Sequence, residues 1–300
     1  GERVAVEVLM PPGSTEETFA PTPRQMVALA RAEVYVLVGH PGFLVERRHV
    51  LPALERNPGV RVVDMSLRHP VRQGAPYEPA GAPQEPVGEE LASSRDPSPP
   101  TEHSPRADAR SAPTRNGTVP TSGEPAHDAH DHHGGTGDPH VWTSPRRMRS
   151  AAGVVAEALA ELDPEGAPAY RARLESLLAQ IDALDAEIRR ELSGLERRRF
   201  LVVHPAWGHF AADYGLEQVA IEHEGKMPGP RGLVALVESA RAEGVRVVFA
   251  QRGFPRAPAE AVAAEIGGRV VTLDPLARSW LDATRTTARA IAAALAGPAG

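Results

Sequence analysis

The sequence predicts an α/β protein with two lobes, each built on a parallel sheet, joined by one long helix. Strand-like and helix-like segments alternate over residues 3–63 and again over residues 200–295, a pattern typical of parallel sheets covered by helices. Between these regions, apolar residues at spacings of three and four predict a helix over residues 168–195. At ~1.5 Å per residue it is about 40 Å long, enough to reach across two lobes.

The first lobe begins with an alternating, β-branched run over residues 3–10, which predicts a strand. Thr22 followed by Pro23 predicts the start of a helix that ends near Glu33, because threonine caps helices and proline suits the first helical position. The next predicted elements are a strand over residues 34–38, a helix over 43–56 and a strand over 60–63.

Residues 71–138 differ in composition from the rest of the chain. Proline, glycine, serine, alanine and charged residues dominate, and large apolar residues almost vanish. Such a segment buries too little apolar surface to offset the entropy of ordering it, so we expect a disordered loop. Helical periodicity resumes with a helix predicted over residues 145–162.

The last third returns to alternating strands and helices. Strands are predicted over residues 200–203, 218–221, 245–250 and 270–273, and helices over 205–214, 230–243, 258–266 and 278–295. The predicted organisation is therefore a first lobe over residues 1–165, an interlobe helix over 166–197 and a second lobe over 198–300.

Composition excludes several classes of protein. The 300 residues carry a net charge of −6 and form no basic stripe, which argues against nucleic acid as a partner. The chain has no cysteine, so thiolate metal sites and disulfides are excluded. No apolar run is long enough to span a membrane. The chain opens on a strand-like run and not on a signal peptide.

Three polar residues lie at the ends of predicted strands or beside a helix start. His140 stands in Asp-Pro-His-Val-Trp, His204 follows the strand over 200–203, and Asp274 follows the strand over 270–273. Ligands of open α/β sheets gather at such strand ends. Taken singly, each has an ordinary alternative: a hydrogen-bonded histidine in the first two cases, and a turn or helix cap for an aspartate before proline.

Together with other short motifs these residues form an ordered set. Pro11-Pro12-Gly13, Pro21-Thr22-Pro23, Asp138-Pro139-His140-Val141-Trp142, His204 before Tyr214-Gly215-Leu216, and Leu273-Asp274-Pro275-Leu276 follow one another along nearly the whole chain. The chain thereby resembles the zinc- and manganese-type (cluster 9) solute-binding proteins of ABC importers. The resemblance implies two Rossmann-like lobes joined by a rigid backbone helix, with a metal ion in the interlobe cleft.

The resemblance also implies a set of metal ligands. His140, His204 and Asp274 match the second, third and fourth ligands of the family, and Glu17 stands where the family usually has its first histidine. A carboxylate can ligate zinc, although added carboxylate shifts the preference toward manganese. If Glu17 is a bystander, another group or a water closes the site; the stand-ins are Glu16, His40, His209 and His223.

Two further departures from the family stand out. Gln251 occupies a strand end where the family often has glutamate, and the strand and helix that usually precede residues 3–10 are not in this sequence. The chain also carries a histidine-rich stretch with interleaved aspartates, as the zinc-specific members often do: His127, His130, His132 and His133. We interpret it as a low-affinity zinc antenna, with a solvated linker as the alternative.

The expected function is capture of Zn²⁺, with Mn²⁺ as the alternative, and delivery to the membrane permease of an ABC importer. The resemblance implies a monomer in the periplasm or outside the cytoplasmic membrane, with or without a lipid anchor, and no catalytic residues. Two alternatives stay open: a metalloenzyme with a chelatase-like two-lobe fold, and a surface metal buffer or adhesin that uses the same site.

Overall fold

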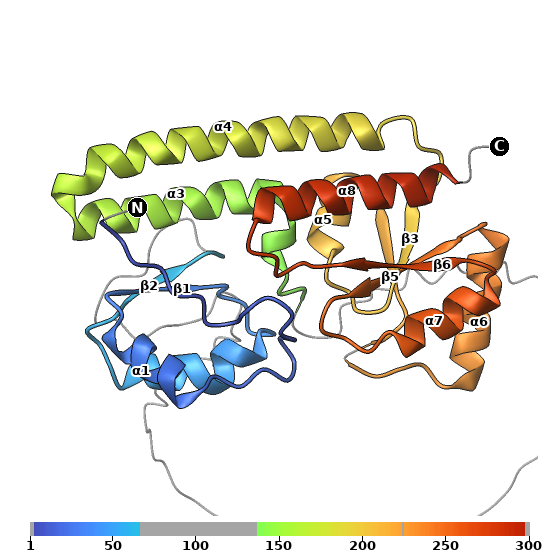
Figure 1. Ribbon diagram of the computed structural model, residues 1–300, viewed down its shortest axis with the longest axis horizontal. Helices are drawn as coiled ribbons and strands as arrows, with labels where there is room; N and C mark the ends of the chain where they lie inside the picture. Colours follow the sequence, from blue (N-terminus) through green and yellow to red (C-terminus); the bar gives the residue numbers. More distant parts are fainter. Residues whose placement is uncertain (1–2, 67–136, 224, 298–300) are drawn as a thin grey trace, which may run out of the picture. The chain divides into compact units, whose positions relative to one another are not determined.

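Two parallel β-sheets organise the part of the chain that the computed structural model describes, residues 3–66, 137–223 and 225–297 (Figure 1). The first sheet pairs β1 (Val34–Leu37) with β2 (Arg61–Asp64). The second has the order β4-β3-β5-β6. Its strands are β3 (Arg199–Val202), β4 (Glu217–Ala220), β5 (Val247–Gln251) and β6 (Arg269–Leu273), all parallel. The parallel pairing confirms the predicted α/β class.

The predicted strand over residues 3–10 is wrong. These residues pair with none of the described strands, and the side chains of Val6 and Val8 are 76% and 57% exposed. An alternating β-branched run becomes a strand only where a neighbouring backbone supplies its hydrogen-bond partners. Here the segment is anchored instead by a side chain, since Gln25 Nε2 donates to the carbonyl of Leu9 at 2.6 Å.

The first helices follow their sequence signals closely. α1 (Pro23–Arg31) begins with a capping box in which Thr22 and Gln25 satisfy each other's backbone N–H groups. The single helix predicted over residues 43–56 is divided into a π-helical turn, η1 (Glu46–Val50), and α2 (Leu51–Glu55). Pro52 has no N–H to donate to the preceding turn, which accounts for the change in hydrogen-bond pattern before it.

The long helix forms as predicted, with shifted ends. α3 (Pro145–Leu162) and α4 (Ala167–Leu192) lie side by side in Figure 1. α4 buries Ile181, Leu184, Ile188 and Leu192. The spacing of three and four residues places these side chains on one stripe of the helix. The helix ends before the predicted residue 195 because Ser193 leaves the helical conformation and Gly194 has a φ of 75°.

Helices cover both faces of the second sheet. Phe200 and Val202 of β3 pack with residues of α4, α5 and α8, whereas Leu201 packs with α6 and α7, as the two-residue period of a strand requires. The helices are α5 (Gly208–Asp213), α6 (Pro230–Ala242), α7 (Ala257–Glu265) and α8 (Trp280–Ala296). All five residues of β5 are buried, which is typical of a central parallel strand.

Two of the sequence predictions remain predictions. The segment predicted to be disordered lies outside the described residues except for its last two, and the lobe boundaries at residues 165 and 197 stay predictions. Every helix within the described ranges is too short or too polar to cross a bilayer.

A buried carboxylate supports the loop that follows β1. Glu46 is 3% exposed and accepts the backbone N–H groups of Val38 at 2.7 Å and Gly39 at 3.1 Å. Burial, together with the charge of Asp64, raises the pKa of Glu46 to about 7, although the two hydrogen bonds oppose the rise. The folded state therefore binds this proton more tightly than the unfolded chain does.

The pKa of Glu46 predicts a pH dependence of stability. Because the pKa rises on folding from 4.5 to about 7, the contribution of Glu46 is full below pH 4.5 and is lost as the pH rises through 7, by at most ~3 kcal/mol. In metal-free protein we expect the free energy of unfolding of the wild type to fall, relative to that of Glu46→Gln, between pH 4.5 and 8. Denaturant unfolding measures it, with exposed Glu55→Gln as control. A pH-independent difference between wild type and Glu46→Gln would contradict the assignment.

The packing of α4 predicts that substitutions at different positions of this helix lower the free energy of unfolding by different amounts. Ile188 is fully buried and Leu177 is 36% exposed. We expect Ile188→Ala to lower the free energy of unfolding by ~2–5 kcal/mol, because it leaves a cavity in the core. Leu177→Ala should cost far less, since its side chain already contacts water. Denaturant unfolding checks both variants, and equal losses would show that the buried stripe is misassigned.

Candidate metal centre

Three ionisable side chains meet in the interior of the described structure. Oε1 of Glu16 lies 2.7 Å from Nε2 of His140 and 3.0 Å from Nε2 of His204, and the two ring nitrogens are 3.2 Å apart. The three residues are between 3% and 5% exposed. One carboxylate and two imidazoles with converging donor atoms can hold a divalent metal ion.

Each of these residues lies in a different local structure. His204 lies two residues beyond the carboxyl end of β3, and His140 immediately precedes the 3₁₀ turn η2 (Val141–Thr143). Glu16 lies in a turn closed by the backbone hydrogen bond from Phe19 N to the carbonyl of Thr15 at 2.9 Å. Glu16 is 124 residues from His140 and 188 from His204 along the chain, so the contact depends on tertiary packing.

The structure brings Glu16, and not Glu17, against the two rings. The Glu17 side chain is 34% exposed, and its Oε1 is 3.7 Å from Nδ1 of His204. Successive side chains in a tight turn point in different directions. Glu17 aligns with the family's first ligand, but its neighbour Glu16 is the residue that faces the two rings. Glu17 belongs instead to a second group of candidate ligands, with His204 and Glu222.

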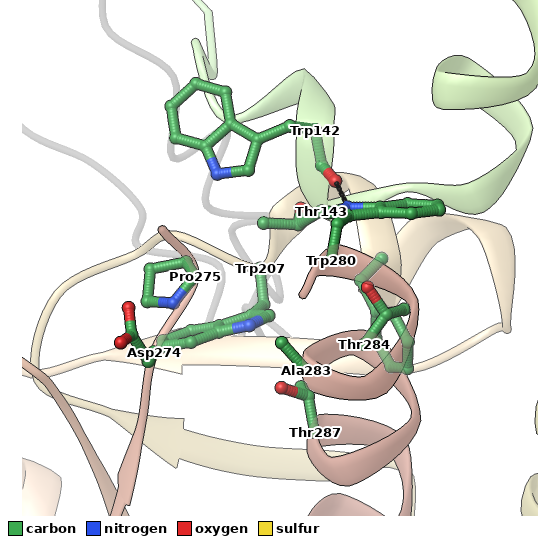
Figure 2. Close-up of a pocket in the computed structure, with 10 residues that line it drawn as sticks. Trp142, Thr143, Trp207, Asp274, Pro275, Trp280, Ala283, Thr284 and Thr287 are labelled. Carbon is green, nitrogen blue, oxygen red and sulfur yellow. Dashed lines mark hydrogen bonds between the residues drawn. The ribbon is translucent and has the colours of Figure 1, made fainter. Parts of the chain in front are cut away.

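Asp274 lies outside both groups of candidate ligands. Its Oδ2 is 3.2 Å from Nε of Arg252, and its Oδ1 accepts the backbone N–H of Leu276. It lines a pocket with all three tryptophans of the chain, in which Trp280 Nε1 donates to the carbonyl of Trp142 at 2.7 Å (Figure 2). The fourth predicted ligand therefore has its own partners in this structure.

Gln251 contacts the group from the end of β5. Its Nε2 lies 3.4 Å from Oε2 of Glu16, the oxygen that the histidines do not use. The side chain is 1% exposed, and its Oε1 has no hydrogen-bond partner among the described residues. An amide at this position donates to the Glu16 carboxylate, whereas the glutamate common in the family would repel it.

The remaining stand-ins do not join the group. His40 Nδ1 accepts the N–H of Gly42 at 3.0 Å, His209 Nε2 donates to the carbonyl of Asp138 at 2.8 Å, and His223 is exposed. The histidine-rich stretch that contains His127, His130, His132 and His133 lies outside the described residues.

Two carboxylates that the sequence did not single out contact the far side of the rings. Asp138 Oδ1 lies 2.6 Å from Nδ1 of His140, and Glu222 Oε1 contacts Nδ1 of His204. Asp138 could have been suspected from its place in the Asp-Pro-His motif. Glu222 follows β4 in the chain, and only the pairing of β4 with β3 places it beside His204.

The charges of the group depend on one another. Burial favours the neutral form of Glu16, but hydrogen bonds from both histidines outweigh it and hold the pKa of Glu16 below its usual range. Burial likewise opposes the charge on His204, yet bonds to Glu16 and Glu222 raise its pKa to about 9. The pKa of His140 is raised against the effect of burial by Asp138 and Glu16. A cation at this point would find the Glu16 carboxylate ionised.

Comparisons with known proteins identify a family and several relatives. The family model described as the periplasmic component A of the zinc-uptake complex matches residues 1–294. A putative metal-binding protein of Treponema pallidum is 33% identical over 157 residues, 51% of this chain and 50% of the relative. Zinc-binding protein AdcA of Streptococcus pyogenes is 27% identical over 141 residues, 46% of this chain and 27% of AdcA. The chain thus spans half or less of the length of these curated relatives.

Solved structures share the fold over nearly the whole chain. A zinc-bound deletion mutant of ZnuA matches with a TM-score of 0.72 and 30% identity, covering 100% of this chain and 92% of its own. The periplasmic zinc-binding protein TroA from Treponema pallidum matches with a TM-score of 0.66 and 19% identity over 96% and 90% of the two chains. The two-lobe α/β fold predicted from the sequence is therefore confirmed.

The neighbouring glutamates provide a test of which carboxylate binds metal. We expect Glu16→Gln to weaken zinc binding more than ~10-fold, because Glu16 contacts both rings directly, and Glu17→Gln to have a much smaller effect. Competition titration of zinc against a chromophoric chelator measures both variants under identical conditions. A larger loss of zinc affinity in Glu17→Gln than in Glu16→Gln would show that Glu17 is the ligand.

Proposed function

Because the chain belongs to the family of periplasmic zinc-uptake component A proteins, which its match over residues 1–294 establishes, we propose that it captures a divalent transition metal and delivers it to an ABC permease. Zinc is the proposed cargo, and manganese is the alternative. The observation that carries the proposal is the convergence of Glu16 Oε1 with Nε2 of His140 and of His204.

The donor set suits this cargo. Imidazole nitrogen and carboxylate oxygen are the zinc ligands available to a chain without cysteine. Imidazole favours zinc over manganese, whereas each added carboxylate shifts the preference toward manganese. Two imidazoles with one buried carboxylate support zinc as the preferred ion.

We propose Asp274 as the fourth donor, reached by exchange of its partner. Arg252 is 65% exposed, and ion pairs at such exposed positions contribute only ~0–1 kcal/mol. A divalent cation held by Glu16, His140 and His204 attracts the Asp274 carboxylate more strongly than one solvated guanidinium does. Glu17 is the other candidate, since its Oε1 lies 3.7 Å from Nδ1 of His204.

The proposed role is binding without catalysis. A metalloenzyme needs an open metal position beside a general base, whereas family membership supports a solute-binding component. We place the protein outside the cytoplasmic membrane as a monomer, in keeping with the periplasmic description of the family. The stretch from His127 to His133 is proposed as an auxiliary zinc antenna.

Metal titration of the demetallated protein tests the proposal. We expect one tight zinc site in the wild type, and a loss greater than ~100-fold for both His140→Ala and His204→Ala, exceeding that typical of outer-shell partners. Asp274→Ala should weaken zinc binding by a smaller factor. Competition between zinc and manganese in the same assay ranks the two ions.

His49→Ala is the matched control, because His49 lies in η1 and belongs to neither ligand group. It should bind zinc as the wild type does. Wild-type zinc affinity in both His140→Ala and His204→Ala would refute the proposed site. Failure of the wild-type protein to bind zinc tightly would refute the proposed function itself.

A further inference from the structure

Both histidines of the metal centre are held through the ring nitrogen that faces away from Glu16. Asp138 accepts from Nδ1 of His140 at 2.6 Å, and Glu222 accepts from Nδ1 of His204. The two carboxylate side chains are each 9% exposed. Each ring therefore lies between one carboxylate on its Nδ1 side and the shared Glu16 oxygen on its Nε2 side.

The partner of Nδ1 decides what Nε2 can do. A neutral imidazole carries its proton on one nitrogen and a lone pair on the other, and only the lone pair can bind a metal ion. A carboxylate that accepts the Nδ1–H fixes the proton there and leaves Nε2 free. In His204, Nε2 is the nitrogen that faces Glu16 and His140.

The stacking contact of His204 does not fix the ring in this way. Its ring stacks on Phe254, with centroids 4.7 Å apart and an interplanar angle of 26°. Stacking fixes the plane of the ring but does not distinguish one edge from the other, so a half-turn of the ring about its Cβ–Cγ bond would keep the stack and put carbon atoms where the two nitrogens now lie. The contacts of Nδ1 with Glu222 and of Nε2 with Glu16 both select one of the two orientations, and only the contact with Glu222 leaves Nε2 free for a metal ion.

The backbone places Glu222 beside His204. Ile221 N donates to the carbonyl of Val202 at 2.8 Å, and Glu222 N donates to the carbonyl of Val203 at 3.1 Å. The pairing of β4 with β3 thus continues to the residue before the ligand. Glu17, at 3.7 Å from the same nitrogen and 34% exposed, has no comparable register with the strand.

We propose that Glu222 is a positioning residue of the metal centre: its carboxylate holds the Nδ1 proton of His204 and so presents Nε2 to the metal ion. The inference rests on the proposed function, because it requires His204 to be a ligand. Asp138 holds His140 in the same manner, but its Oδ1 also accepts the backbone N–H of His140 at 2.9 Å. Substitution of Glu222 therefore separates ring orientation from local backbone structure more cleanly.

Two variants of Glu222 distinguish positioning from simple charge. Glu222→Ala removes the acceptor, and we expect its zinc dissociation constant to rise ~10–100-fold, the range typical of lost outer-shell partners. Glu222→Gln keeps a carbonyl oxygen that can accept the Nδ1–H, although a neutral acceptor bonds less strongly. The zinc affinity of Glu222→Gln should therefore fall by less than ~10-fold. Chelator competition on the full chain measures both, with Glu238→Gln on the exposed side of α6 as a charge-matched control.

NMR of the zinc-loaded proteins gives a readout that a merely structural role would not change. We expect a slowly exchanging Nδ1 proton of His204 in the wild type and in Glu222→Gln, and rapid exchange or a changed ligating nitrogen in Glu222→Ala. If Glu222→Ala misfolds, Glu222→Gln still tests the inference. A loss of zinc affinity in Glu222→Gln as large as that in His204→Ala would overturn it.

The zinc-binding results distinguish failure of this inference from failure of the proposed function. Wild-type protein that binds no zinc refutes the proposed function. Wild-type protein that binds zinc tightly, with Glu222→Ala binding within twofold of it and an unchanged His204 proton signal, overturns the positioning role and leaves the proposed function standing.

Discussion

The contact between the Glu16 carboxylate and the rings of His140 and His204 removes three ionisable groups from water. Isolated charges in a protein interior are costly, and they persist only where they are paired and hydrogen-bonded. Here every ring nitrogen faces a carboxylate oxygen, so the donors stay charged and oriented without an ion. A divalent cation entering this point replaces protons that the histidines otherwise hold, because metal ligation requires deprotonated imidazole.

The second parallel sheet supplies three of the residues around this point. The carboxyl ends of β3 and β5 lie at the same edge of the second sheet, and they lead directly to His204 and Gln251. β4 continues beside β3 and brings Glu222 to the outer nitrogen of His204. One sheet therefore provides His204, the carboxylate that contacts its Nδ1, and the amide that contacts Glu16. Helices cover both faces of this sheet, as is usual for parallel sheets.

Glu16 and Asp274 illustrate how carboxylates of similar chemistry receive different environments. Glu16 is 5% exposed, and its oxygens contact two histidines and one amide. Asp274 pairs with an exposed arginine, and screening by water makes such a pair weak. The first carboxylate is thus committed to the site, whereas the second can exchange partners at little cost. This difference supports the proposal that a bound ion recruits Asp274 to the three donors that already converge.

The sequence by itself determined the α/β class and the long helix, and it singled out His140 and His204, whose rings meet in the structure. Alternation, helical spacing and short motifs are local properties of the chain. It misassigned residues 3–10, since a strand exists only with a partner strand, and it favoured Glu17 over Glu16, since turn geometry decides which neighbour faces inward. Only the tertiary structure decided that Glu222 meets His204 and that Asp274 pairs with Arg252. These contacts join segments that no sequence periodicity relates, and packing alone sets their distances.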